Sequence, residues 1–504
     1  MLVVSSFDVL TTEKATPREW ASLGILTLAV MLLSIDGTVL ALAVPSISED
    51  LQPTSTQILW IGDIYSFALA GLLITMGNMA DRVGRKRLLL IGAACFGAAS
   101  VLAAFAPTAE VLIAARALLG VAGSTLMPST LSLVRATFRD ARQRTTAIAV
   151  WAAGASGGAA AGPLIGGALL EHFWWGSVFL INVPVIVLIL TGGVFLLQES
   201  RGESRNPIDL LSAVLSIAAI VPVVYAVKHL AGEGLDGTVP AFTALGVVAA
   251  VLFVRRQRRL QTPLIDLELF RVPAFSGAIL ANALGVFAFI GLLFFFSQYL
   301  QLVRGLSPLE AGIHQLPATV ASVAVVAVVG LLSRRLGKGR AIGGALLLAG
   351  AGMASLASTE GLSAYFGIAL SLVALGLGEG IAMTLATDAV VAAVPRERAG
   401  AASAISETAY ELGTALGIAI LGSLQTAFYR SRLNLDDVPK DEAAAVRESL
   451  ASATEALPSG STALLHAQEA FTAGMQVTTV LAAVLLAAGG ILALRVIPSE
   501  REKS

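Results

Sequence analysis

A few ionisable residues interrupt the long uncharged stretches of this chain. Asp36 lies within residues 21–45, and Arg116 lies within residues 110–134. A charge in an apolar span is costly, so each side chain is expected to face a partner or a polar cavity instead of lipid. A carboxylate beside a guanidinium in such a place can switch its charge with protonation. The two residues therefore predict a proton-coupled pair.

Carboxylates interrupt uncharged stretches elsewhere as well. Glu407 and Glu411 are one helical turn apart and share a helix face, while Glu379 and Asp63 lie in other predicted helices. Such carboxylates can bind a proton or, once it has left, a lipophilic cation, and this competition gives exchange. We assign Glu407 to proton coupling and cation contact, Glu411 and Glu379 to cation contact, and Asp63 to the outer entrance. The alternative for each is a structural ion pair or a carboxylate near the interface.

Aromatic side chains can line a cavity for cations, because the face of an aromatic ring attracts positive charge. We place Tyr65, Trp151, Phe295 and Tyr410 in the substrate site. Packing within the protein or contact with lipid is the alternative for each ring. Trp60 falls at the end of a predicted span, where aromatic residues mark the membrane interface.

The composition explains how these residues come to be embedded. Hydrophobic residues make up 56% of the 504 positions and charged residues only 13%, against roughly 25% charged residues in a soluble domain. Such a chain needs lipid as the solvent for its surface. The pattern predicts an all-α membrane protein of fourteen transmembrane helices, at residues 21–45, 58–78, 88–106, 110–134, 145–170, 175–198, 209–230, 239–255, 275–301, 311–332, 341–357, 362–393, 399–428 and 470–495.

Other classes of function find no support in the sequence. The net charge of −1 gives no electrostatic footprint for nucleic acid. The chain has no Gly-x4-Gly-Lys-Ser/Thr phosphate loop, and its four histidines lack metal-ligand spacing. There is neither a catalytic cluster nor the large soluble domain that an enzyme or receptor would need. We therefore expect no enzymatic activity, no metal and no cofactor, with an ion gradient as the energy source.

Basic residues predict the orientation in the membrane. With the N-terminus inside, most of the 33 Lys and Arg residues fall on the cytosolic side, which the positive-inside rule favours. Both termini are then cytosolic, and Lys228 is assigned to an external loop. The long polar connection Arg430–Gln468 is also external. A solvated loop is its simpler interpretation, and a lid is the alternative.

The chain contains an internal repeat. Residues 77–87 recur at 330–340, and the glycines of 158–167 recur at 413–422, at nearly constant offsets of 253 and 255. Parallel repeats with a substrate site between them are a transporter plan. We predict an N-terminal six-helix half at 1–200, two peripheral inserted helices at 201–260, and a C-terminal six-helix half at 261–504 with a long external loop at 429–469.

Two motifs of the first repeat are more specific. The fifth predicted helix combines small residues, which allow close helix contact, with a proline that kinks it. The turn before the third helix needs a glycine and pairs an acid with basic residues. The helix motif is Gly158, Gly162, Pro163, Gly166 and Gly167, and the loop motif is Gly77, Asp81, Arg82, Gly84 and Arg85.

These motifs resemble those of the major facilitator superfamily. The loop resembles its signature loop, which gates the inward-closed state in that family, and the fifth helix resembles the motif of its antiporters. The residues from Ser34 to Pro45, with Asp36, resemble the first helix of the fourteen-helix drug:proton antiporters, the family that includes QacA, SmvA and LfrA. Ala41 departs from that motif, which usually has Asn there. LfrA-type pumps for fluoroquinolones and dyes look most similar.

The resemblance implies a proton-coupled multidrug efflux antiporter of the major facilitator fold, with two pseudo-symmetric halves plus two inserted helices. Its expected cargo is lipophilic cationic drugs, dyes and quaternary ammonium compounds, fluoroquinolones included, so it would confer antibiotic resistance. The expected setting is the bacterial cytoplasmic membrane, where the protein works as a monomer with protons and the lipid bilayer as its other partners. The alternative is a same-fold exporter of one narrow physiological substrate, a lipid or a siderophore.

Overall fold

The computed structural model describes residues 14–138, 140–201, 209–232, 234–325, 328–361, 365–394, 399–435, 438 and 442–498. All regular elements in these ranges are helices. They are α1 Pro17–Leu51, α2 Ser55–Val83, α3 Arg85–Ala104, α4 Ala109–Thr137, α5 Ala141–His172, α6 Ser177–Leu180, α7 Asn182–Leu196, α8 Leu210–Gly232, α9 Thr238–Gln257, α10 Pro273–Gln298, α11 Pro308–Ala324, α12 Val329–Leu336, α13 Lys338–Thr359, α14 Tyr365–Ala392, α15 Ala399–Arg432, α16 Ala443–Glu448, α17 Leu450–Ala456 and α18 Thr462–Val496, with a 3-10 turn at Leu269–Arg271 and a π turn at Tyr299–Val303.

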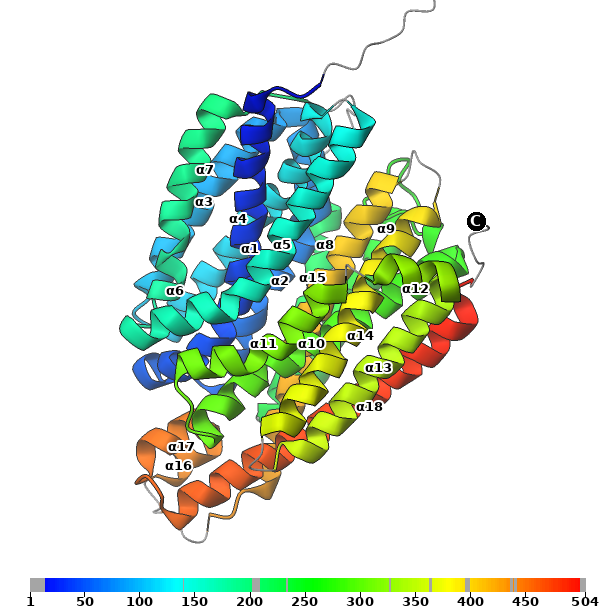
Figure 1. Cartoon of the computed structure of the whole chain (residues 1–504). Coiled ribbons are helices and arrows are strands. Elements are labelled where there is room, and N and C mark those ends of the chain that lie inside the picture. The colour runs from blue at the N-terminus through cyan, green and yellow to red at the C-terminus, as the bar shows by residue number, and fades with distance from the viewer. Residues whose placement is uncertain are drawn as a thin grey trace, which may run out of the picture.

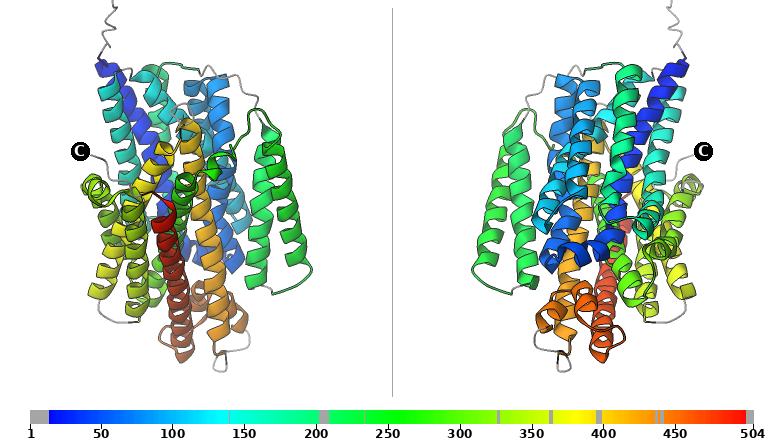
Figure 2. Two further views of the ribbon diagram at one scale, coloured as in Figure 1. Left: turned by 90° about the vertical axis from the view of Figure 1, so that its right-hand side faces the viewer. Right: turned by 90° about the vertical axis from the view of Figure 1, so that its left-hand side faces the viewer.

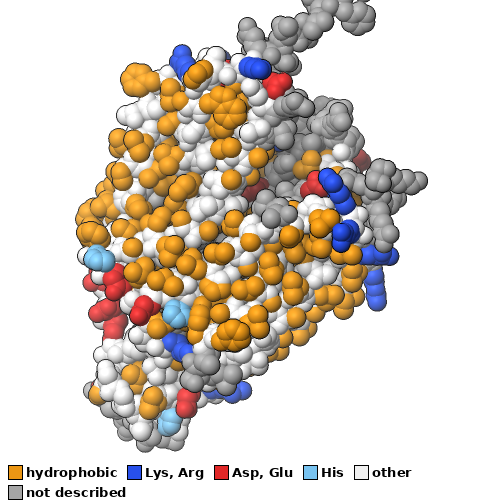
Figure 3. Space-filling view, in the orientation of Figure 1, with side chains coloured by type: hydrophobic (Ala, Val, Ile, Leu, Met, Phe, Trp, Pro, Cys, Tyr) orange, Lys and Arg blue, Asp and Glu red, His pale blue; other side chains and the backbone are white. Residues whose placement is uncertain are grey.

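The helices are long and apolar enough to cross a membrane. Thirteen spans within the described residues meet this test, and α11 with α12, bent by 56°, makes a fourteenth if the two count as one. The predicted all-α membrane fold of fourteen helices is therefore confirmed. Hydrophobic side chains cover most of the flank seen in Figure 3, as expected of a surface that faces lipid.

The helices form two bundles, which we call the N half (α1–α7) and the C half (α10–α18), with the α8–α9 hairpin beside them (Figures 1 and 2). We call the end of the molecule where α1 begins the terminus face, and the end with α16 and α17 the loop face. The halves diverge toward the terminus face and meet toward the loop face (Figure 1). The meeting surfaces pair α2 with α15 and α5 with α11.

Repeated glycines occupy equivalent places in the two halves. Gly84 ends α2 with φ 118°, and Gly337 ends α12 with φ 80°. An L-residue rarely adopts such a positive φ, so both turns need glycine. A Cβ on Gly84 would also stand 2.7 Å from the Glu199 carboxyl carbon. The sequence repeat thus corresponds to a repeated turn geometry.

Two parts of the chain differ from expectation. The loop predicted at 429–469 is partly helical, because α15 extends to Arg432, α16 and α17 follow, and α18 begins at Thr462; residues 436–437 and 439–441 lie outside the described ones. Lys228 lies within α8 and is buried, so its assignment to an external loop is wrong. The single lysine did not end the apolar helix, because a buried acid compensates its charge.

Candidate functional site

Asp36 and Arg116 form a buried ion pair in the N half. Arg116 on α4 places Nη1 3.0 Å from Oδ2 of Asp36 on α1, and the two side chains are 2% and 0% exposed. The guanidinium also donates from Nε to the backbone oxygen of Ile61, at 3.2 Å. A buried pair is held well only when further hydrogen bonds satisfy it. These bonds fix Arg116 against both α1 and α2.

Asn182 completes this arrangement and was missed as a site residue. Its amide donates to Oδ1 of Asp36 at 2.9 Å and lies 3.2 Å from Oγ of Ser100. Asn182 begins α7, directly after the short helix α6. An asparagine among the apolar residues of a span end is the sequence signal that could have identified it. We call Asp36, Arg116, Asn182 and Ser100 the N-half cluster.

Tyr65 lies between the N-half cluster and the C half. The Arg116 guanidinium carbon stands 4.8 Å from the centre of the Tyr65 ring, a cation–π contact. The phenol is close enough to Asp36 and to Glu411 to interact electrostatically with both. Of the four predicted aromatic residues, Tyr65 is thus the one that reaches the predicted proton pair.

Three carboxylates of the C half lie close to one another. Glu379 lies near the middle of α14, and Glu407 and Glu411 lie one turn apart on α15. All three interact electrostatically with Tyr410, which places them around one tyrosine. Glu411 lies beside Ser66 of α2, across the meeting surface of the halves. We call the three glutamates the acidic cluster.

Glu379 is the least satisfied member of the acidic cluster. Its side chain fills the space beside Gly285 of α10, where a Cβ would otherwise stand. Its Oε2 is buried and accepts no hydrogen bond from the described residues. A buried carboxylate oxygen without a partner is unfavourable unless it takes up a proton or a ligand. This oxygen is therefore a candidate position for a proton or a cation.

Three predicted residues lie elsewhere. Asp63 forms a buried pair with Lys228 of α8, instead of lining an entrance. Phe295 packs with Leu59 and other apolar side chains in the cluster that joins the halves toward the loop face. Trp151 donates to Oγ1 of Thr130 at 3.2 Å, within the N half. The residues next to each of them in the sequence could not show whether its side chain contacts such a partner or lines a common substrate cavity.

The loop motif is held by its own half. Asp81 pairs with Arg85 at 2.9 Å, and the backbone N–H of Arg85 donates to Ser200. Glu199 accepts hydrogen bonds from the backbone of Lys86 at 3.1 Å. Gly77 and Arg82, the other members of the motif, lie on the last turns of α2. The arrangement anchors the α2–α3 turn to the end of α7.

The glycine motif of α5 brings helices into close contact. Gly158, Gly162 and Gly166 face α1, where added Cβ atoms would collide with Met31, Thr38 and Val39. Gly167 instead faces Leu309 of α11, and Gly312 of α11 faces the backbone oxygen of Pro163. One face of the motif therefore packs within the N half, and its loop-face end packs against the C half.

Polar contacts also close the loop face between the halves. Glu448 of α16 accepts hydrogen bonds from the backbone and the hydroxyl of Ser55, at the start of α2. Arg430 donates to the same hydroxyl at 3.1 Å. Gln301 donates to the backbone oxygen of Leu42 at 3.1 Å. The segment predicted as a solvated loop thus docks across the two halves.

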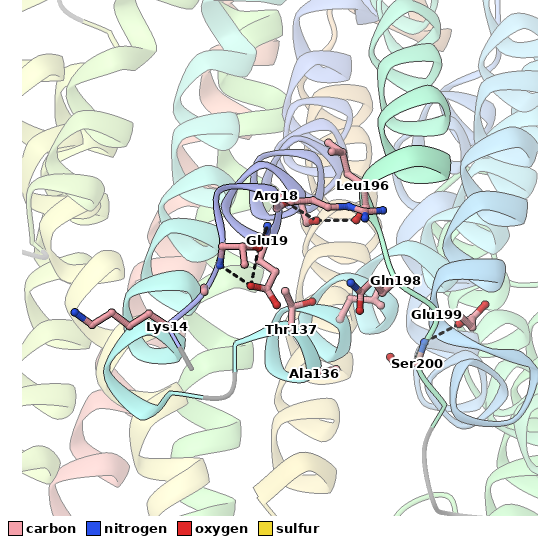
Figure 4. Close-up of a pocket in the computed structure, with 13 residues that line it drawn as sticks. Lys14, Arg18, Glu19, Ala136, Thr137, Leu196, Gln198, Glu199 and Ser200 are labelled. Carbon is pink, nitrogen blue, oxygen red and sulfur yellow. Dashed lines mark hydrogen bonds between the residues drawn. The ribbon is translucent and has the colours of Figure 1, made fainter. Parts of the chain in front are cut away.

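One pocket opens on the terminus face. It has a volume of about 330 Å³ and lies within the N half, between the start of α1 and the ends of α4 and α7 (Figure 4). Arg18 crosses it and donates to the backbone oxygen of Phe195 at 2.7 Å. None of the predicted site residues lines it, so we do not assign it to transport. No group of three metal-ligating side chains occurs among the described residues.

Comparison with known proteins agrees with this arrangement. The profile of the Major Facilitator Superfamily matches residues 26–418. A bacterial homologue of the human lysosomal transporter Spinster, solved in an inward-facing and unoccupied conformation, superposes with a TM-score of 0.68 at 19% identity. The superposition covers 96% of this chain and 98% of that one, which shows the fold.

Several curated proteins are similar along most of their length. The multidrug efflux pump LfrA of Mycolicibacterium smegmatis is 47% identical, over 95% of this chain and 96% of LfrA. The methyl viologen resistance protein SmvA of Salmonella typhimurium is 40% identical, over 83% and 85% respectively. The tetracenomycin C resistance and export protein of Streptomyces glaucescens is 34% identical, over 94% and 91%. The chain belongs to the Major Facilitator Superfamily, in the family of these efflux proteins, and is a membrane transporter, not an enzyme.

Proposed function

We propose that this protein is a proton-coupled antiporter that exports lipophilic cationic drugs, dyes and quaternary ammonium compounds, fluoroquinolones included. The observation that carries the proposal is that, in the described part of the chain, one half holds a paired carboxylate and the other half holds an unpaired one. The N-half cluster holds a carboxylate that is fully paired. The acidic cluster holds Glu379, whose Oε2 has no partner among the described residues. The names of two relatives support this substrate class, since LfrA is a multidrug efflux pump and SmvA is a methyl viologen resistance protein.

The proposed cycle follows from the positions of these groups. Protonation of Asp36 would remove the charge that holds Arg116, and Arg116 could then turn toward Tyr65 and Glu411, which lie within its electrostatic reach. A cation held by the acidic cluster would then compete with the arginine for the same negative charge. Binding of proton and drug becomes mutually exclusive, which is the condition for exchange.

The proposed orientation places the terminus face in the cytosol and the loop face outside a bacterial cytoplasmic membrane. The distribution of Lys and Arg supports this choice. The halves meet toward the loop face and diverge toward the terminus face (Figure 1), so we assign the conformation as inward-facing. We further propose that a monomer is the working unit, because each chain contains both halves of the substrate path.

The test is ethidium transport by the purified protein in proteoliposomes with an imposed proton gradient. We expect gradient-driven transport in the wild type and its loss in Asp36→Asn and Glu407→Gln. Asp388→Asn is the matched control, because Asp388 is an exposed carboxylate of α14 that pairs with Lys338 at 2.7 Å, and it should retain transport. Full-rate, gradient-dependent transport by Asp36→Asn would refute the coupling role. A folded wild type that moves no cation at any gradient would favour a narrow substrate instead.

A further inference from the structure

A lysine of the inserted hairpin reaches into the transporter. Nζ of Lys228, on α8, lies 2.7 Å from Oδ2 of Asp63 on α2, and both side chains are fully buried. The same ammonium stands 3.5 Å from the centre of the Trp60 ring. A carboxylate and an aromatic face around one cation are the groups that bind organic ammonium ions. The lysine therefore occupies a position with the chemistry of a cation site.

Apolar packing already holds the hairpin against the rest of the protein, so the hairpin does not need Lys228 for its attachment. Phe67 of α2, Val224 of α8, and Ala415 and Ala419 of α15 already form a buried apolar cluster that joins the three helices. A buried ion pair contributes little over such packing unless further hydrogen bonds satisfy it. Apart from Lys228, no side chain among the described residues donates a hydrogen bond to Asp63. An incompletely satisfied pair is suited to exchange of its partner.

The Lys228–Asp63 pair lies beside the surface where the two halves meet. α8 contacts both α2 and α15, which form one of the surfaces where the halves meet. Asp63 is also close enough to Arg116 to interact with it electrostatically. A change in how the halves meet must therefore change the surroundings of the Lys228–Asp63 contact.

We propose that Trp60 and Asp63 form a binding site for organic ammonium ions, and that Lys228 fills this site as a tethered substitute in the present conformation. A cationic substrate and the Lys228 ammonium exclude one another there. Lys228 must withdraw before Asp63 accepts a cation, so the hairpin sets when the site is open. This inference rests on the proposed export of cations and adds to it a site and its internal competitor.

The first test replaces the tethered cation with a free one. Lys228→Ala removes three carbons and the amine, which n-propylammonium restores. We expect n-propylammonium to raise the Tm of the purified Lys228→Ala protein saturably, whereas n-propanol does not. The wild type, whose site is filled, and the double variant Lys228→Ala/Asp63→Asn should show no such rise. Equal effects of the amine and the alcohol, or an equal rise in the double variant, would overturn the proposal.

The second test measures competition with substrate. Lys228→Met keeps the apolar stem without the charge, and we expect it to bind ethidium roughly tenfold more tightly than the wild type, because the competing internal cation is gone. Asp209→Asn is the matched control, since it breaks the pair with Arg256 at the other end of the same hairpin and should leave ethidium affinity unchanged. Unchanged affinity in Lys228→Met would count against the site. A wild type that binds no ethidium, together with rescue by n-propylammonium, would refute drug export while sustaining the cation site.

Discussion

Asn182 donates a 2.9 Å hydrogen bond to Oδ1 of Asp36, although 146 residues separate the two in the chain. The bond leaves Oδ2 of Asp36 for Arg116. Asn182 therefore orients the carboxylate and holds its negative charge, in addition to filling space between α1 and α7. A residue with this role should affect coupling even though it carries no charge itself.

Asn182→Ala should slow proton-driven ethidium transport roughly tenfold, because a hydrogen bond to a charged group contributes about 1.5–3 kcal/mol. The pH dependence of transport should change as well, since the charged form of Asp36 loses its donor. Ser100→Ala is the comparison variant, because it removes the second acceptor of the Asn182 amide and keeps the Asn182–Asp36 bond. Initial rates across a range of pH provide the measurement. A reduced rate with an unchanged pH profile would indicate that Asn182 supports only the fold.

Removing one partner of the Asp36–Arg116 pair should be more damaging than removing both charges. Arg116→Gln leaves Asp36 without its ion-pair partner, and breaking a buried pair in this way costs about 3–5 kcal/mol. The double variant Asp36→Asn/Arg116→Gln should recover most of the Tm but not proton-driven transport. Thermal unfolding and transport are to be measured on the same preparations. Recovery of coupled transport in the double variant would show that this pair is structural.

Gly162→Ala should impair the protein, because the new Cβ collides with Oγ1 of Thr38 on α1. Overpacking of this kind costs about 1–3 kcal/mol, so we expect a lower Tm and slower transport. Gly157→Ala, on the same helix, meets nothing within 4 Å. It should be neutral or slightly stabilising, since alanine favours a helix by about 1 kcal/mol over glycine. Equal Tm values for the two variants would argue against the close α1–α5 contact.

Closure of the loop face should strengthen as the pH falls. Partial burial raises the pKa of the Glu455 carboxyl on α17, and the nearby charge of Glu49 raises it further, while a hydrogen bond from Gln52 opposes the rise. Docked α17 thus binds a proton more readily than free α17, so docking gains stability as the pH falls through the raised pKa.

The measurement for this effect is the accessibility of a cysteine placed at Ser449, in a background where Cys95, the single native cysteine, is replaced by Ser. Labelling should slow at lower pH after correction for thiol ionisation. Glu455→Gln should remove most of that dependence. The effect should be small, because Glu455 lies at an exposed position. A pH dependence that is unchanged in Glu455→Gln would assign it to another group.

Much of the fold could be predicted because the local composition of a segment decides whether it can span a membrane. Uncharged stretches of about 20 residues identify spans without knowledge of any neighbour. The bent pair α11 and α12 was predicted as one helix, since apolar composition does not report a break. The segment 429–469 was predicted as an external loop, because its polar composition does not reveal short helices such as α16 and α17.

The sequence by itself determined which charges are embedded, since only their cost in lipid makes Asp36, Arg116 and the glutamates stand out. It also determined the repeated turns at Gly84 and Gly337, where the backbone conformation requires glycine. The sequence also predicted Asp36 as the partner of Arg116. Only the tertiary structure decided that Asn182 binds the same carboxylate and that Asp63 pairs with Lys228, because helices far apart in the chain pack side by side. The sequence of one helix cannot specify the partner of its side chains, because the packing geometry of two helices decides which side chains meet.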